Sequence, residues 1–469
     1  MLGRCSPSDE PREAALNVQT EATDSSADLG SRLYWLALLT GLLVGAIGAG
    51  FHALIDRLGA LRAAFAAGGF DASPVVQAVA GLLAGLPLPA ETGARLLILF
   101  LLVATALGMA RLMVRGFAPE TAGSGVQEIE GYLLGLRPLR WRRILGVKFV
   151  AGGLALGAGF VLGREGPTIQ MGGAAGMGLA AGIGCNRAET RALVAAGAGA
   201  GIAAAFNAPI AGALFVIEEL RRASPYSFRS YHAVLIASVA ATFVTQAFAG
   251  VGPELRLAID APSLAQYPLF IALGVALGAG GAVFNRLVLL SLDVFGAWSR
   301  RAPTSLVLAL ALGLTALLYT MPQATGGGEQ IIPSLAAMPP EIGALLLLLV
   351  LRCGASLASY AAGAPGGIFA PILALATVAG LAFAEAAHML LPGAPLEPTA
   401  AAAAAMAALF TGSVRAPLVG VVLVAELTDA YPAILAITLS SAMASLTAAA
   451  LGGRPLYEEL LERTLRLAR

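Results

Sequence analysis

Long stretches without a charged side chain dominate this chain. They cover residues 33–55, 166–186, 192–217, 303–328, 353–384 and 431–453. Each stretch reaches the roughly 20 residues that an α-helix needs to cross a bilayer. The pattern predicts an all-α, multi-pass membrane protein.

Composition supports the same class. Of the 469 residues, 58% are hydrophobic and only 12% are charged, which is typical of membrane proteins. With a net charge of +1 and no basic tail, nothing indicates a nucleic-acid partner, and we expect none. Three cysteines and three histidines are scattered without the spacing of a disulfide framework or a metal site. We therefore expect neither a metal nor a cofactor.

The ends of the chain and its basic loops predict the topology. Residues 1–31 are polar, lack the pattern of a signal peptide and are expected to form a disordered tail. Only about a dozen residues follow Tyr457, so we expect no soluble C-terminal domain. Basic residues gather in 137–143, 221–229, 300–301 and after Arg454. By the positive-inside rule these segments, and both termini, should face the cytoplasm.

One charged motif lies inside the apolar sequence: Gly163-Arg164-Glu165-Gly166-Pro167. A carboxylate is costly in hydrocarbon, so its presence indicates a function. The flanking Gly and Pro predict a helix that begins at or just after Glu165, with Pro167 in its first turn. Because a helix N-terminus in mid-membrane offers unpaired N–H groups and a positive dipole end, it binds anions. Glu165 would compete with such an anion and could take up a proton.

The chain also contains a repeat. Three segments of the first half match three of the second in the same order: 123–129 with 326–332, 163–167 with 367–371, and 207–218 with 415–426. The first repeat is expected at about 32–250 and the second at about 262–469, together forming one transmembrane domain over 32–469. Repeated halves with Gly/Pro-interrupted helices indicate a transport site at the interface between the halves.

Differences between the halves select candidate functional residues. Ser124 aligns with Gly327, Glu165 with Phe369, and Glu219 with Leu427. By contrast, Glu218 and Glu426 occur at equivalent positions, which predicts a shared structural role.

These residues resemble the signature of the CLC family of chloride channels and chloride/proton antiporters, in its prokaryotic, exchanger-like form. The matching segments are 123–128, 163–167, 367–371 and 453–457, and the resemblance runs from about Leu33 to the C-terminus. It implies a fold of about 18 tilted and partial helices in two inverted-topology halves. It also implies a homodimer in the membrane lipid, here a bacterial inner (plasma) membrane, that transports chloride and protons.

The resemblance assigns roles residue by residue. Ser124 and Tyr457 resemble the family's chloride ligands, and the backbone around Ile368, Phe369, Glu165 and Gly166 resembles its N–H donors. Glu165 matches the external gating glutamate and Glu219 the internal proton glutamate of the exchangers. Gln127 stands where the family usually has Pro, from which we expect altered local rigidity.

The residues themselves leave other interpretations open. Ser124 is also placed to be a helix N-cap, Tyr457 an interfacial anchor, and Glu219 a partner of Arg221 or Arg222. An ion pair between Arg164 and Glu165 is disfavoured because adjacent helical residues do not face each other.

Three functions follow from these interpretations. H+/Cl− antiport without enzymatic activity is the favoured one. A passive CLC-type chloride channel is the main alternative. An intramembrane hydrolase with Ser124 as nucleophile is remote, because no histidine lies in a matching catalytic motif.

Overall fold

The computed structural model describes residues 31–83, 89–220, 228–391 and 396–468. Within these ranges the protein is all-helical, with 18 α-helices, five short 3-10 helices and no β-strand, so the predicted fold class is confirmed. Residues 1–30 of the predicted tail and most of the basic segment 221–229 lie outside the described residues.

The helices of the first half are α2 (Arg32–Ala66), α3 (Pro74–Leu82), α4 (Ala90–Phe117), α5 (Val126–Leu133), α6 (Trp141–Gly157), α7 (Glu165–Ile183), α8 (Arg187–Phe206), α9 (Pro209–Glu218) and α10 (Phe228–Ala249). Those of the second half are α11 (Tyr267–Arg301), α12 (Pro303–Thr320), α13 (Ile332–Ala337), α14 (Ile342–Ala361), α15 (Phe369–Leu390), α16 (Pro398–Val414), α17 (Pro417–Thr428), α18 (Ile434–Ala450) and α19 (Leu456–Ala468). The 3-10 helices are η2 (Pro119–Thr121), η3 (Leu264–Gln266), η4 (Pro322–Ala324), η5 (Glu329–Ile331) and η6 (Tyr431–Ala433).

Helix lengths agree with a multi-pass protein that also contains partial helices. Eight helical segments among the described residues are long and apolar enough to cross a bilayer. Others are too short to do so, such as α9 and α17. In a membrane, such interrupted helices are tolerated only where protein buries them or where they line a cavity.

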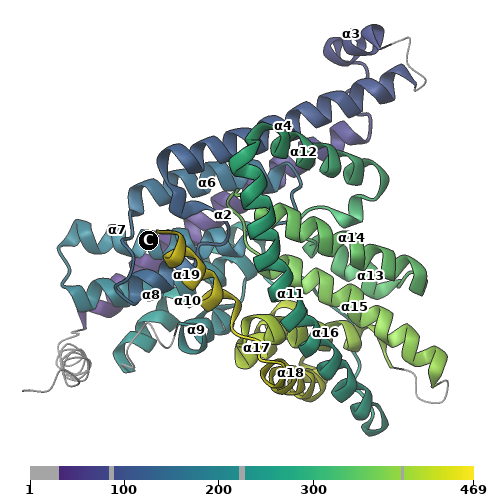
Figure 1. Cartoon of the computed structure of the whole chain (residues 1–469). Coiled ribbons are helices and arrows are strands. Elements are labelled where there is room, and N and C mark those ends of the chain that lie inside the picture. Colours follow the sequence, from purple (N-terminus) through teal and green to yellow (C-terminus); the bar gives the residue numbers. More distant parts are fainter. Residues whose placement is uncertain (1–30, 84–88, 221–227, 392–395, 469) are drawn as a thin grey trace, which may run out of the picture.

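The two halves pack in the same way. In the first half α7 packs on α8 and α2 on α10; in the second, α15 packs on α16 and α11 on α18. Figure 1 shows α7, α8 and α10 on one side of the molecule and α13, α14 and α15 on the other, with α11 between them. The connecting segment lies along the second half, since Leu255 N–H donates to Leu427 O (2.9 Å) and Leu257 N–H to Thr428 O (3.1 Å).

Small residues allow the central helices to approach closely. A Cβ added to Gly172 of α7 would overlap the carbonyl oxygen of Gly197 in α8, and one added to Gly197 would overlap that of Gly172. Close backbone contact of this kind is how helices associate in lipid, where hydrophobic burial supplies no driving force. The glycine-rich sequence of these helices is therefore a packing requirement.

The non-helical segments before α7 and α15 meet each other. Gly163 N–H donates to Gly367 O (2.9 Å) and Gly367 N–H donates to Gly163 O (2.6 Å). These two glycines are equivalent in the sequence repeat. Beyond them α7 begins at Glu165 with Pro167 in its first turn, which confirms the predicted helix start. The N-termini of two helices are thus brought together inside the protein.

The repeated glutamates join the short helices α9 and α17 reciprocally. Glu426, in the last turn of α17, accepts from the N–H groups of Ile210 (3.1 Å) and Ala211 (2.7 Å) at the start of α9. Glu218, at the end of α9, accepts from Leu418 (3.2 Å) and Val419 (2.8 Å) at the start of α17. The predicted shared structural role of Glu218 and Glu426 is confirmed.

We expect Glu426→Ala to lower the free energy of unfolding by about 2 kcal/mol, because two N–H groups at the start of α9 lose a charged acceptor. Thermal denaturation of the purified protein in detergent measures this loss. Glu341→Ala is the matched control, since Glu341 precedes α14 without a side-chain cap hydrogen bond. An equal loss of stability in both variants would contradict the capping role.

Candidate anion and proton site

The Glu165 carboxylate occupies the N-terminus of the opposite half's helix. Its Oε1 accepts from the N–H groups of Phe369 (2.7 Å) and Ala370 (3.4 Å), the first residues of α15. Glu165 is fully buried. A helix N-terminus presents unpaired N–H groups and a partial positive charge, so the carboxylate fills a place suited to any small anion.

The backbone packs so closely around the Glu165 side chain that its neighbours Gly163 and Gly367 must be glycine. A Cβ on either Gly163 or Gly367 would overlap the carboxylate. The second oxygen, Oε2, is buried and accepts no hydrogen bond from the described residues. The carboxylate is therefore held through one oxygen, which leaves the other available to carry a proton.

Arg164 does not pair with Glu165. Its guanidinium instead pairs with Glu254 and with Glu329, at 3.6 Å from Nε to Oε1, and donates to Ala205 O (3.1 Å). This agrees with the expectation that neighbouring residues on a helix point in different directions.

Ser124 lies directly beside this pair of helix starts. A Cβ on Gly166 would come within 2.6 Å of Ser124 Oγ and 2.8 Å of Gly367 Cα. Ser124 is fully buried, and its hydroxyl makes no hydrogen bond of normal geometry to the described residues. The N-cap alternative is wrong, because α5 is capped by Gly125 in a left-handed conformation (φ 88°) and without a side-chain bond.

Tyr457 approaches the same point from α19. Its phenol lies next to the Ser124 hydroxyl and within electrostatic range of both Glu165 and Glu219. The Tyr457 ring packs edge-on against Phe369, with 5.6 Å between ring centroids. Because Tyr457 is 1% exposed, it is not an interfacial anchor. The structure thus brings Ser124, Tyr457 and the start of α15 together around one position.

Glu219 lies directly after α9. It is partly exposed, as expected for a group that reaches one surface. The alternative partners Arg221 and Arg222 fall outside the described residues.

A buried lysine holds the Ser124 loop in place. Lys148 of α6 is fully buried, and its Nζ donates to the carbonyl oxygens of Thr121 (3.0 Å), Gly123 (2.7 Å) and Ser124 (2.9 Å). The charge therefore supplies a donor to three buried backbone acceptors, of which Gly123 O also accepts from Gly366 N–H (3.0 Å). This contact fixes the position of the serine.

The second half has an equivalent buried cation, which the sequence analysis did not identify. Arg352 of α14 is fully buried and donates to the carbonyl oxygens of Gln323 (2.6 Å), Thr325 (3.4 Å), Gly326 (3.2 Å) and Gly327 (3.1 Å). Its signal in the sequence is a single cation inside an apolar helix, at the position that matches Lys148 in the repeat.

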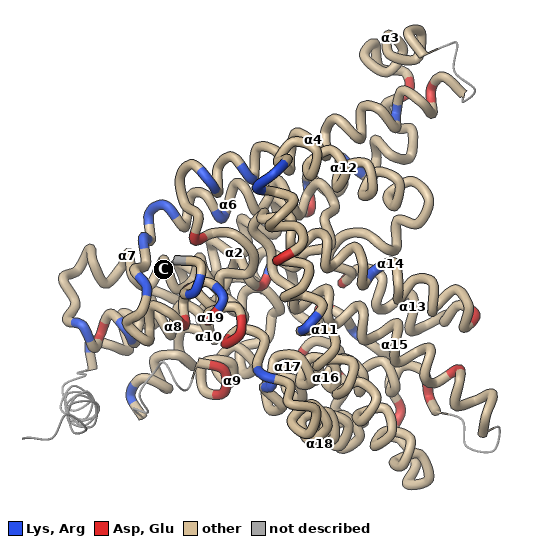
Figure 2. Tube along the Cα trace, in the orientation of Figure 1, with Lys and Arg blue, Asp and Glu red and all other residues tan. Residues whose placement is uncertain are grey.

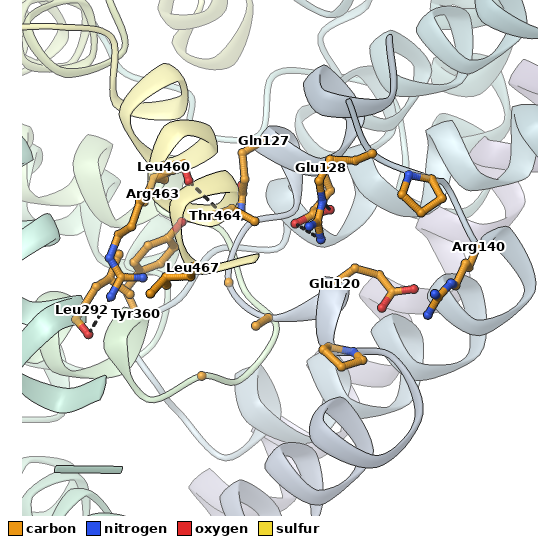
Figure 3. Close-up of a pocket in the computed structure, with 16 residues that line it drawn as sticks. Glu120, Gln127, Glu128, Arg140, Leu292, Tyr360, Leu460, Arg463, Thr464 and Leu467 are labelled. Atoms are coloured by element: carbon orange, nitrogen blue, oxygen red, sulfur yellow. Dashed lines mark hydrogen bonds and ion pairs between the residues drawn. The ribbon is translucent and has the colours of Figure 1, made fainter. Parts of the chain in front are cut away.

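A cavity of about 560 Å³ leads toward the Ser124 loop from one face of the protein. Gly123 and Tyr360 lie among its lining residues, next to Ser124. Figure 3 shows Leu460, Thr464 and Leu467 of α19 on one side and Gln127 and Glu128 of α5 on the other.

The wall of this cavity carries an ion pair. Arg137 Nε contacts Glu128 Oε2 at 2.8 Å, and Arg140 and Arg463 add further positive charge. Gln127 stands in the first turn of α5, as predicted; its effect on rigidity stays a prediction. The three arginines outnumber Glu120 and Glu128 in the lining, and this small excess of positive charge favours an anion.

Together, the fold and the site define a multi-pass membrane protein in which two helix starts meet around a buried carboxylate. The family model "Voltage gated chloride channel" matches residues 100–449.

The chain is similar over most of its length to H(+)/Cl(−) exchange transporters ClcA. The protein from Vibrio cholerae serotype O1 (strain M66-2) is 41% identical over 442 residues, covering 92% of this chain and 89% of the relative. The protein from Salmonella paratyphi B is 45% identical over 372 residues, covering 78% of each. The solved structure of a slow cyanobacterial Cl−/H+ antiporter superposes with a TM-score of 0.84 at 35% identity, covering 94% of this chain and 99% of that one. The chain belongs to the voltage-gated chloride channel (CLC) family.

We expect Lys148→Met to lower the free energy of unfolding by roughly 1–3 kcal/mol, because three carbonyl groups lose a charged donor and those of Thr121 and Ser124 depend on it most. Chloride binding should weaken in the same variant as the Ser124 loop loosens. Thermal denaturation and calorimetric chloride titration measure the two effects. Arg143→Met, which removes an exposed cation from the same helix, should change neither; a similar effect there would indicate that Lys148 acts only through net charge.

Proposed function

We propose that the protein exchanges chloride for protons across a membrane. The observation that carries this proposal is the Glu165 carboxylate bound to the N–H groups of Phe369 and Ala370. A carboxylate and a chloride ion cannot hold the same donors at once. Protonation neutralises the carboxylate and weakens its hydrogen bonds to the start of α15. Chloride can then bind these N–H groups.

Chloride binds on both sides of this gate without a fixed countercharge. Ser124 and Tyr457 offer hydroxyl groups to the ion, and the backbone N–H groups of Ile368 and Phe369 and those around Glu165 and Gly166 complete its shell. Hydrogen bonds to an ion contribute roughly 1.5–3 kcal/mol each, so several hold a dehydrated chloride. A site that lacks a direct cation contact still releases the ion, as turnover requires.

Two carboxylates carry the proton. Glu165 exchanges it with the outer side, and Glu219 exchanges it with the inner side. Tyr457 supports this route, because it lies within electrostatic range of both. Chloride bound between Ser124 and Tyr457 would therefore affect both protonation steps, which is the coupling that exchange needs.

The basic side of the molecule faces the cytoplasm of a bacterial inner membrane, with both termini on that side. Figure 2 shows Lys and Arg residues gathered around α6 and α19, and the positive-inside rule assigns such a side to the cytoplasm. The 560 Å³ cavity is then the inner mouth of the anion pathway. The functional unit is a homodimer surrounded by lipid, with the apolar exposed residues Ile210 of α9 and Leu418 of α17 as part of the contact surface.

Proton flux into liposomes that contain the purified protein tests the exchange. With an imposed chloride gradient and no pH gradient, we expect protons to move uphill. Glu165→Ala should abolish this movement yet keep chloride flux, because the anion path loses its gate and its proton carrier together. Proton pumping that persists in Glu165→Ala would overturn the mechanism.

Glu219→Gln is the companion variant in the same assay. It keeps the shape of the side chain but cannot carry a proton, so chloride should move without protons. Chloride flux without any proton movement in the unmutated protein would instead identify a passive channel.

A further inference from the structure

A second carboxylate lies next to the proposed gate. Glu329, in η5, faces Arg164, the residue that directly precedes Glu165, with 3.6 Å between Glu329 Oε1 and Arg164 Nε. Its Oε1 is buried and has no hydrogen-bond partner among the described residues. Glu329 is thus held by the charge of Arg164, and its Oε1 makes no hydrogen bond to the described residues.

Glu329 and Glu165 meet around the same helix start. A Cβ on Gly327 would lie 3.8 Å from both Glu329 Oε2 and the Ala370 side chain, and Ala370 N–H is one of the donors to Glu165. The charge of Glu329 also acts on Glu165. The two carboxylates therefore flank the first turn of α15.

Access to water differs between them. The side chain of Glu329 is 18% exposed, whereas Glu165 is fully buried. Of the two carboxylates beside the start of α15, Glu329 is therefore the one with access to solvent.

The sequence repeat shows that the fold does not require this carboxylate. Glu329 aligns with Val126, which is completely buried and apolar. The preceding glycines, Gly125 (φ 88°) and Gly328 (φ 97°), adopt the same left-handed conformation in both halves. The backbone conformation occurs in both halves, but the charge occurs only in the second. This indicates that the charge has a function rather than a structural role.

We propose that Glu329 is the outer proton-exchange residue of the gate, and this inference rests on the proposed chloride/proton exchange. Glu329 takes a proton from the outer solution and transfers it to the Glu165 carboxylate, which becomes neutral as Glu329 regains its charge. The groups around Glu329 are Arg164 at the start of α7, Glu165, Glu254 of the connecting segment, Arg352 of α14, and His52 of α2 near Arg164. Arg164 positions Glu329 and holds it beside the gate.

Liposome transport with the complete chain tests this role. We expect Glu329→Gln to slow chloride-driven proton movement by about tenfold, because a positioned proton carrier is lost. The ratio of chloride to protons should stay unchanged, since Glu165 and Glu219 still couple the flows. Glu329→Asp, which retains a carboxylate, should recover most of the rate. Glu329→Ser serves the same test if the glutamine variant does not fold.

Two matched controls separate proton exchange from other effects. Glu254→Gln removes the other carboxylate from Arg164 but leaves Glu329, and Glu341→Gln removes an exposed carboxylate from the segment before α14. Both should keep proton movement within about twofold of the unmutated protein. In a Glu165→Ala background, Glu329→Gln should leave chloride flux unchanged, which also shows that the variant is folded.

The outcomes distinguish this inference from the proposed function. Normal proton movement in Glu329→Gln, or an equal loss in Glu254→Gln, would overturn the role of Glu329 while exchange itself stands. No proton movement in the unmutated protein would overturn the exchange and this inference together.

Discussion

The structure depends on two helix starts that meet inside the membrane. Gly163 and Gly367 exchange backbone hydrogen bonds, and the helices that follow them, α7 and α15, direct their N-termini at a common region. Each N-terminus leaves N–H groups unpaired and carries a partial positive charge. Water cannot satisfy these groups in hydrocarbon, so an anion or a carboxylate must. Glu165 does so for α15 in the conformation described here.

Much of the remaining structure keeps this arrangement in place. Lys148 and Arg352 bind the carbonyl groups of the loops that precede α5 and η5, one in each half. Close glycine contacts, such as Gly172 with Gly197, bring the helices near enough for the loops to meet. The scaffold is symmetric, and the chemistry is added by residues that break the symmetry. Ser124, Glu165 and Glu329 each face a different residue type in the opposite half.

The sequence predicted the parts of this arrangement that depend on local pattern. The helix start at Glu165 followed from Gly and Pro, and the structural role of Glu218 and Glu426 followed from their recurrence. Local pattern could not show which N–H groups Glu165 would contact, because Phe369 is more than 200 residues away. Only the family resemblance pointed to the backbone around Phe369. The alternative that Ser124 is a helix N-cap was wrong, because Gly125, in the left-handed conformation, is the N-cap of α5. Arg352 was missed because a lone cation in an apolar helix does not reveal that it binds backbone carbonyls.

The central claim is that Glu165 and chloride compete for the N–H groups of Phe369 and Ala370. Crystals grown in bromide, which scatters anomalously and replaces chloride, test it most directly. The account predicts an anomalous peak at these two N–H groups in Glu165→Ala and none there in the unmutated protein at neutral pH. A peak at this position in both proteins, or in neither, would contradict the competition.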